Sequence, residues 1–133
     1  MKYFKFSEFT RSETANRLGI DNSIPPKYLS NIVDLVENVL DPLRESYGKP
    51  IRVTSGYRCQ RLNKAVGGVS NSQHQYGMAA DIQGSPGTYS ELIKLANIIE
   101  NLGLEHDQLI LEKKSWIHVS FVKGHNRNQN FSL

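Results

Sequence analysis

The sequence predicts an α+β fold in which a small antiparallel sheet packs against helices. Segments 27–47 and 88–102 repeat apolar residues at the three- and four-residue spacing of amphipathic helices. Segments 50–58 and 78–84 have the length and apolar content of short strands, and 106–122 contains two more that a tight turn joins. Helices and strands thus alternate along the chain, and we expect both long helices on one face of the sheet.

The first predicted element is a short helix over residues 7–19, which begins with good capping residues and ends at Gly19. A long amphipathic helix over 27–47 follows and stops at Gly48. Its apolar positions are Leu29, Ile32, Val33, Val36, Val39, Leu40 and Leu43. Pro42 is expected to kink its last turns.

The middle of the chain predicts two strands separated by a loop. In the strand over 50–58, Ile51 and Val53 point the same way. Residues 62–72 are rich in Gly, Ser and Asn and predict a loop. The apolar run at 78–84 predicts a short buried strand.

The last third predicts a helix and a hairpin. The helix over 88–102 has an apolar face made of Leu92, Leu95, Ile98, Ile99 and Leu102. Strands over 106–112 and 116–122 are joined by Lys-Lys-Ser, which indicates a hairpin. The polar tail after Gly124 is expected to be irregular.

Composition sets broad limits on the protein. The 133 residues suit one domain that can bury a core, and the single Cys59 allows no internal disulfide. The net charge of +3, from 16 basic and 13 acidic residues, weakly favours a polyanionic surface such as DNA or a bacterial wall and does not decide between them. The first residues lack the apolar stretch of a signal peptide, and no segment is long enough to span a membrane. We therefore expect a protein made in the cytoplasm without a signal peptide.

A buried aspartate follows the predicted loop. Asp81 lies in Ala-Ala-Asp-Ile between apolar neighbours, where an unpaired carboxylate is costly. A metal ion, an arginine or a helix N-terminus would each offset that cost. Because His74 lies seven positions earlier in a polar stretch, the pair is a candidate metal site.

His118 offers a third ligand. It alternates with Ile117 and Val119, so it faces away from them and is either a solvent-facing histidine or part of a site. A hairpin centred on Ser115 would pair Glu112 with His118 on one face of the sheet. Two histidines and an aspartate suit a catalytic zinc that keeps a position for water, and a nearby Glu that is not a ligand would accept a proton from that water.

Three ordered motifs carry a resemblance to a known family. They are Ser-Gly-Tyr-Arg-Cys at 55–59, Ser-x-His-x-x-Gly-x-Ala-x-Asp at 72–81 and Trp-x-His at 116–118. Together they resemble the zinc D-alanyl-D-alanine carboxypeptidase-like metallopeptidases, a group of peptidoglycan peptidases that includes phage endolysins and shares its fold with the hedgehog signalling domain. The resemblance covers residues 25–123 and implies a single zinc peptidase domain over 1–133 with a hedgehog/D-Ala-D-Ala peptidase-like fold.

The resemblance also implies roles for single residues. Zinc would be bound by three ligands, His74, Asp81 and His118. Arg58 would bind the anionic end of the substrate; the alternative is that it caps a carboxylate at the surface. We expect Ser72 and Trp116 to contact the substrate as well.

The catalytic base departs from the pattern of many members, which carry an acid three residues before the last ligand. This chain has Ser115 there, and Ser115 cannot act as a base. Glu112 lies six residues before the ligand, as in the hedgehog-like branch, and we predict it as the base, with Asp107 as the reserve candidate. Cys59 is expected to be buried or half-buried and unreactive.

Two other histidines, His106 and His125, belong to no motif, and we expect them at the surface. Arg127 lies in the polar tail, and its position relative to the core does not follow from the sequence.

The resemblance implies hydrolysis of peptide bonds at D-amino acids in peptidoglycan stem peptides, by a D,D-carboxypeptidase or by an endopeptidase of the endolysin type. Two alternatives are a non-enzymatic zinc-containing module that binds the wall or a protein, and a phage tail-associated module. We expect a monomer that binds neither nucleic acid nor membrane. It would reach the cell wall after a holin opens the membrane.

Overall fold

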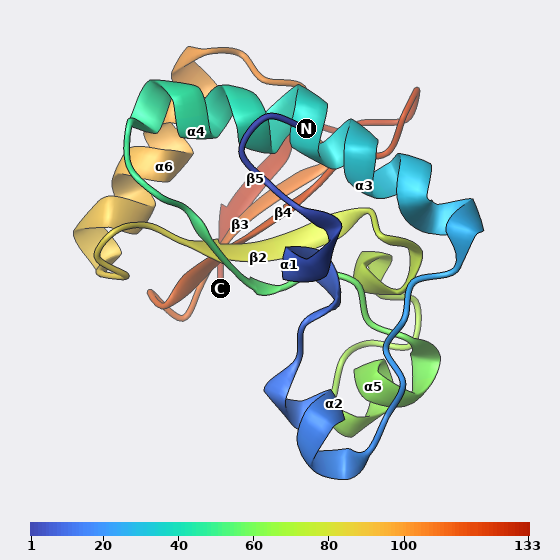
Figure 1. The fold of residues 1–133 in the computed structure, drawn as a ribbon. Helices are drawn as coiled ribbons and strands as arrows, with labels where there is room; N and C mark the ends of the chain where they lie inside the picture. Colours follow the sequence, from blue (N-terminus) through green and yellow to red (C-terminus); the bar gives the residue numbers. More distant parts are fainter.

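A computed structural model describes residues 1–133 and contains one five-stranded sheet with helices packed against it (Figure 1). The helices are α1 (Phe6–Thr10), α2 (Glu13–Leu18), α3 (Leu29–Leu35), α4 (Asp41–Tyr47), α5 (Gln60–Ala65) and α6 (Tyr89–Asn101). The strands are β1 (Arg52–Ser55), β2 (Ala79–Gln83), β3 (Gln108–Glu112), β4 (Trp116–Ser120) and β5 (Gln129–Ser132). The predicted α+β class is therefore confirmed.

The sheet has the order β1-β2-β4-β3-β5. Its first four strands are antiparallel, as predicted, whereas β5 pairs in parallel with β3, so that the sheet is mixed. The tail was expected to be irregular, and that expectation is wrong. The backbone N–H groups of Asn128 and Gln129 donate to the carbonyls of His106 and Asp107 (2.8 and 3.0 Å) and hold the tail on the sheet edge.

The long helix expected over 27–47 is continuous but not uniform. A 3₁₀ turn (Pro26–Tyr28) leads into α3, and a π-helical turn (Val36–Leu40) joins α3 to α4. The N–H of Asp41 donates to the carbonyl of Val36, five residues back. This wider turn lies directly before Pro42, which has no N–H and would crowd the carbonyl of a regular helical turn. The irregularity expected at Pro42 thus takes the form of a π turn.

The helix predicted over 7–19 is two helices. Arg11 is extended (ψ 130°), and the hydroxyl of Ser12 accepts a hydrogen bond from the N–H of Ala15 (3.1 Å). A capping residue inside the segment therefore starts a second helix, α2, which ends at Gly19 as expected.

Part of the loop predicted over 62–72 is also helical. Helix α5 begins at Gln60 because the Cys59 sulfur accepts a hydrogen bond from the N–H of Leu62 (3.4 Å) and caps it. The irregular part of the loop is shortened to 66–72.

Helices α3, α4 and α6 lie on one side of the sheet, and α2 and α5 pack together away from them (Figure 1). On α6, Leu92, Leu95 and Ile99 are fully buried, whereas Leu102, which was expected on the same face, lies past the end of the helix and is half exposed. Buried side chains from Phe4 to Phe121 form the main core. None of the helices is long and apolar enough to cross a membrane. The opposite face of the central strands carries the polar residues considered next.

Candidate metal centre

The residues of the second motif each have a structural role around His74. The hydroxyl of Ser72 accepts a hydrogen bond from the N–H of His74 (3.3 Å) and caps a 3₁₀ turn, Gln73–Tyr76. Gly77 ends this turn in the left-handed region (φ +70°), and a Cβ there would lie 3.1 Å from the side chain of Ile32. The chain then enters β2, and Asp81 follows in the strand.

Strand pairing brings the other two predicted ligands together. Asp81 of β2 lies directly opposite His118 of β4, on the sheet face away from α6. On its other side Asp81 faces a bulge in β1, where the register shifts between Val53 and Ser55. Bulges re-aim the chain next to functional sites, and this one directs Gly56 toward His74.

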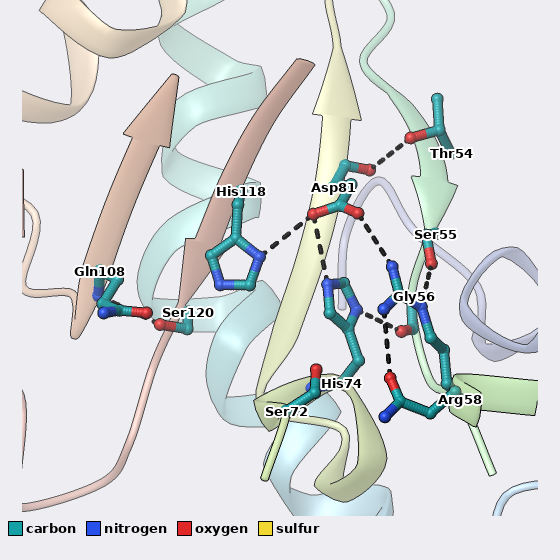
Figure 2. A network of polar contacts seen from close by, with 11 residues as sticks. Thr54, Ser55, Gly56, Arg58, Ser72, His74, Asp81, Gln108, His118 and Ser120 are labelled. Atoms are coloured by element: carbon teal, nitrogen blue, oxygen red, sulfur yellow. Dashed lines mark hydrogen bonds and ion pairs between the residues drawn. The ribbon is translucent and has the colours of Figure 1, made fainter. Parts of the chain in front are cut away.

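The three side chains converge on one point (Figure 2). The Nε2 atom of His74 and the Nδ1 atom of His118 each lie 3.2 Å from Oδ1 of Asp81. All three candidate ligand atoms lie within 4.8 Å of one another. Two ligands of a tetrahedral zinc, each about 2.0–2.1 Å from the ion, are about 3.3 Å apart, so the two histidine–aspartate distances of 3.2 Å fit zinc.

The tautomer of His74 supports a cation at this point. Its Nδ1 lies 2.7 Å from the carbonyl oxygen of Gly56, which can only accept, so Nδ1 carries the proton. In the neutral ring Nε2 then presents a lone pair to the carboxylate of Asp81. Two acceptors facing each other repel unless a proton or a metal ion lies between them. A histidine oriented by a backbone carbonyl is typical of metal ligands, and the residues present fit zinc.

Gly56 is required for this arrangement. A Cβ at Gly56 would lie 2.6 Å from the Cα of Phe9, and the next N–H, that of Tyr57, donates to the Phe9 carbonyl (2.6 Å). The carbonyl that orients His74 is thus held by close packing of β1 against α1.

Asp81 is held in its ionised form. Burial alone would raise its pKa, but when a proton lies between the carboxylate and each ring, hydrogen bonds from His118 and His74 outweigh burial and bring the pKa below its usual range. Its second oxygen, Oδ2, pairs with Nη2 of Arg58 at 3.3 Å. Oδ1 is therefore left for the two histidines and the candidate ion.

The candidate centre lies in a cleft of about 680 Å³. Its wall includes the predicted substrate contacts Arg58, Ser72 and Trp116 and the predicted base Glu112.

A family model described as Peptidase M15 matches residues 2–120 of the chain. The chain belongs to the peptidase M15 family. This finding confirms the predicted resemblance and extends it to α1. A 44-residue stretch is 50% identical to a zinc D-Ala-D-Ala carboxypeptidase of Streptomyces albus G; it makes up 32% of this chain and spans 17% of the length of that protein.

Glu112, the base predicted for this M15 family member, pairs with a residue two positions away from its expected partner. Glu112 pairs with Trp116, and His118 pairs with Ile110, so the predicted direct pairing of Glu112 with His118 is wrong. The hairpin is centred on Lys114 instead of Ser115. Because the shift is two residues, Glu112 still lies on the same face as His118.

Asp107, the reserve candidate, is occupied by other groups. Its oxygens accept from Nε and Nη2 of Arg127 (2.9 and 2.7 Å) and from Nε2 of Gln73 (2.7 Å). The hydrogen bonds from Arg127 outweigh burial and lower the pKa of Asp107 to about 2. A carboxyl group this acidic is a poor proton acceptor near neutral pH, so Glu112 remains the candidate base.

Two of the three remaining predictions hold. Cys59 is half-buried and His125 is exposed, as expected. His106, expected at the surface, is buried, with its ring nitrogens 2.7 Å from the carbonyl oxygen of Leu104 and 2.5 Å from Oδ1 of Asn130. Through Asn130, strand β5 covers His106, and no sequence motif indicates that strand.

Several residues of the cleft were not predicted from the sequence. Gln108 lines the cleft from β3, Lys113 from the hairpin turn and Arg127 from the tail. Alternation along β3 places Gln108 on the face of Glu112, so this residue was open to prediction. Arg127 carried no such signal, because its position depends on the pairing of β5.

Proposed function

We propose that this protein is a zinc-dependent peptidase that hydrolyses peptide bonds at D-amino acids in bacterial peptidoglycan. The observation that carries the proposal is the convergence of His74 Nε2, Asp81 Oδ1 and His118 Nδ1 on one point in a cleft. Family membership and the name of the Streptomyces relative support the choice of substrate.

His74, Asp81 and His118 would hold the zinc ion. When bound, zinc would supply Lewis-acid polarisation of the scissile carbonyl and acidify the attacking water. The chain's own residues maintain the ligand geometry: Gly56 fixes the ring of His74, and Arg58 fixes the carboxylate of Asp81.

Glu112 acts as the general base in this mechanism. It accepts a proton from the water as the water oxygen bonds to the scissile carbon. It then delivers that proton to the departing nitrogen as the carbon–nitrogen bond breaks. Ser72 and Trp116 line the cleft beside it and are proposed substrate contacts.

Arg58 remains a proposed substrate contact, although much of its donor capacity is used within the protein. Its Nε, Nη1 and Nη2 atoms already donate to Ser55, Asn63 and Asp81 (3.0, 3.3 and 3.3 Å).

We also propose that the protein acts outside the compartment in which it is made. Peptidoglycan lies beyond the cytoplasmic membrane, and the proposed route to it is a membrane opening such as a holin provides. The proposed partner is the stem peptide, and the proposed state is a monomer.

The test compares zinc-loaded wild-type protein with Glu112→Gln on purified peptidoglycan, measuring released amino groups and identifying fragments by mass spectrometry. Glu112→Gln should keep its zinc and lose roughly 10²- to 10⁴-fold in rate, the usual contribution of general acid–base catalysis. The fragment masses distinguish a carboxypeptidase, which releases one terminal residue, from an endopeptidase.

Glu105→Gln is the matched control, because Glu105 is exposed and its loss removes the same charge. If Glu112→Gln stays active while Asp107→Asn is inactive with zinc bound, Asp107 is the base. If the zinc-loaded wild type cuts no peptidoglycan from any source, the binding-module alternative replaces the peptidase.

A further inference from the structure

The cleft contains two arginines in different states. Arg58 has three donor nitrogens engaged within the protein, and its side chain is only 16% exposed. Its guanidinium holds the metal ligand Asp81 in place. A substrate carboxylate would have to compete with that contact.

Arg127 lines the same cleft with its donors partly free. Nε and Nη2 donate to the two oxygens of Asp107 along one edge of the guanidinium. The other edge, formed by Nη1 and the second N–H of Nη2, has no partner within the protein, and the side chain is 55% exposed. Such an edge matches a carboxylate with two parallel hydrogen bonds.

The side chain of Arg127 is held in one position by Asp107. Asp107 is 2% exposed and also accepts from the backbone N–H of Arg127 (3.1 Å) and from Gln73, which precedes the metal-site residue His74. An arginine held by a buried carboxylate loses little conformational entropy on binding a ligand.

The strands determine where Arg127 lies relative to the reaction. Asp107 directly precedes β3, in which Ile110 lies opposite His118 and Glu112 is the last residue. Asp107 is three residues from Ile110, about 10 Å at the rise of a strand. Arg127 is thus on the opposite side of the metal centre from Glu112, within reach of a group one to three residues from the scissile bond.

We propose that Arg127 binds a carboxylate of the substrate and selects peptides that carry one on the side of the scissile bond away from Glu112. The proposal rests on the proposed peptidase function and adds a residue beyond the matched range 2–120. The carboxylate is either the chain terminus of the peptide or a side chain, and the test distinguishes them.

The probes are an N-acetylated peptide ending in D-alanyl-D-alanine, its C-terminal amide, and an amidated peptide with a D-glutamate side chain next to the scissile bond. For the wild type, a carboxylate that Arg127 binds should lower KM relative to the plain amide by roughly 10- to 100-fold, the range of a charge-assisted hydrogen bond. Arg127→Gln should abolish that preference, with the zinc content unchanged. Arg127→Lys should retain only part of it, because an ammonium lacks the planar fork.

Lys123→Gln is the matched control. Lys123 is an exposed cation four residues earlier, forms no ion pair and does not line the cleft. A general charge effect would lower affinity equally in both variants and would overturn the assignment to Arg127.

A second readout does not depend on hydrolysis. The only tryptophan, Trp116, lines the cleft, so its fluorescence should report binding of each probe to metal-free protein. If the wild type hydrolyses no probe but binds the acid better than the amide, and Arg127→Gln removes that difference, the peptidase proposal fails and the Arg127 site stands. If the wild type hydrolyses acids and amide with the same KM, the Arg127 proposal is overturned and the peptidase remains.

Discussion

At the scale of single residues, the candidate metal site depends on contacts between residues that lie far apart in the chain. The side chains of His74, Asp81 and His118 come from three separate segments and converge on one point. The tautomer of His74 depends on a carbonyl at Gly56, eighteen residues away, and no local pattern encodes that contact. The same holds for Arg127, whose place in the cleft depends on how the tail folds back.

Zinc binding should follow the number of ligands. Purified protein is expected to bind about one zinc per chain, and His74→Ala, Asp81→Ala and His118→Ala should each lose it, because two ligands seldom hold zinc firmly. Metal analysis after dialysis measures this directly. His125→Ala, at an exposed histidine outside the cleft, should retain full zinc. Full zinc in any of the three ligand variants would remove that residue from the site.

At the scale of elements, periodicity predicted most helices and strands, and the wrong helix boundaries occur where a capping residue starts a new helix. Ser12 and Cys59 each start a helix where the pattern suggested continuity or loop. The hairpin register was wrong by two residues because Lys113 and Lys114 both adopt positive φ (51° and 53°). Such turns usually carry Gly or Asn, so the usual signal for the turn position was absent.

The first turn of α6 carries an ion-pair cluster around the buried Glu91 that should make stability depend on pH. Hydrogen bonds from Lys49, then Lys94 and Tyr47, lower the pKa of Glu91 to about 2. A carboxyl group with a lowered folded-state pKa stabilises the protein above its unfolded pKa, about 4.3, and this contribution is lost as the pH falls toward the folded value. Glu91→Gln should therefore be less stable than wild type at pH 7, and the difference should shrink between about pH 4 and pH 2.

Urea unfolding at several pH values measures this difference. The exposed Glu105→Gln serves as the control and should follow the wild type at each pH. A gap between Glu91→Gln and wild type that stays constant down to pH 2 would contradict the assigned cause.

At the scale of the whole molecule, the sheet order could not be predicted, because β5 pairs with β3 and not with β4, the strand that precedes it in the chain. The helix side and the site side were predicted correctly, since alternation along β4 separates Ile117 and Val119 from His118. What the sequence lacked was any apolar pattern in the tail, all four residues of β5 being exposed. Strand pairing there relies on backbone hydrogen bonds and on the Asp107–Arg127 pair.

Removing residues 122–133 should therefore destabilise the fold as well as the cleft. Four backbone hydrogen bonds outside the regular ladder tie the tail to the sheet, two at His106 and Asp107 and two between Leu133 and the hairpin at Leu111 and Lys113. At about 0.5–1.5 kcal/mol each, their loss would lower the free energy of unfolding by roughly 2–6 kcal/mol. Urea denaturation of the shortened chain measures this.

Arg127→Ala in the full chain separates the contribution of the ion pair from that of the strand. A shortened chain as stable as the full one would show that β5 adds no stability to the sheet.

The close contact between Gly56 and Phe9 links the metal site to the N-terminus of the chain. The loop that orients His74 rests on α1 through the Tyr57 N–H, so undocking α1 would release the ring that holds the ion. Coupling of this kind is reciprocal. If the docking of α1 increases metal affinity, bound metal must stabilise the docked α1 by the same free energy. Hydrogen exchange at the Tyr57 amide, which lies outside the cleft, should therefore slow as the metal occupancy of the site rises.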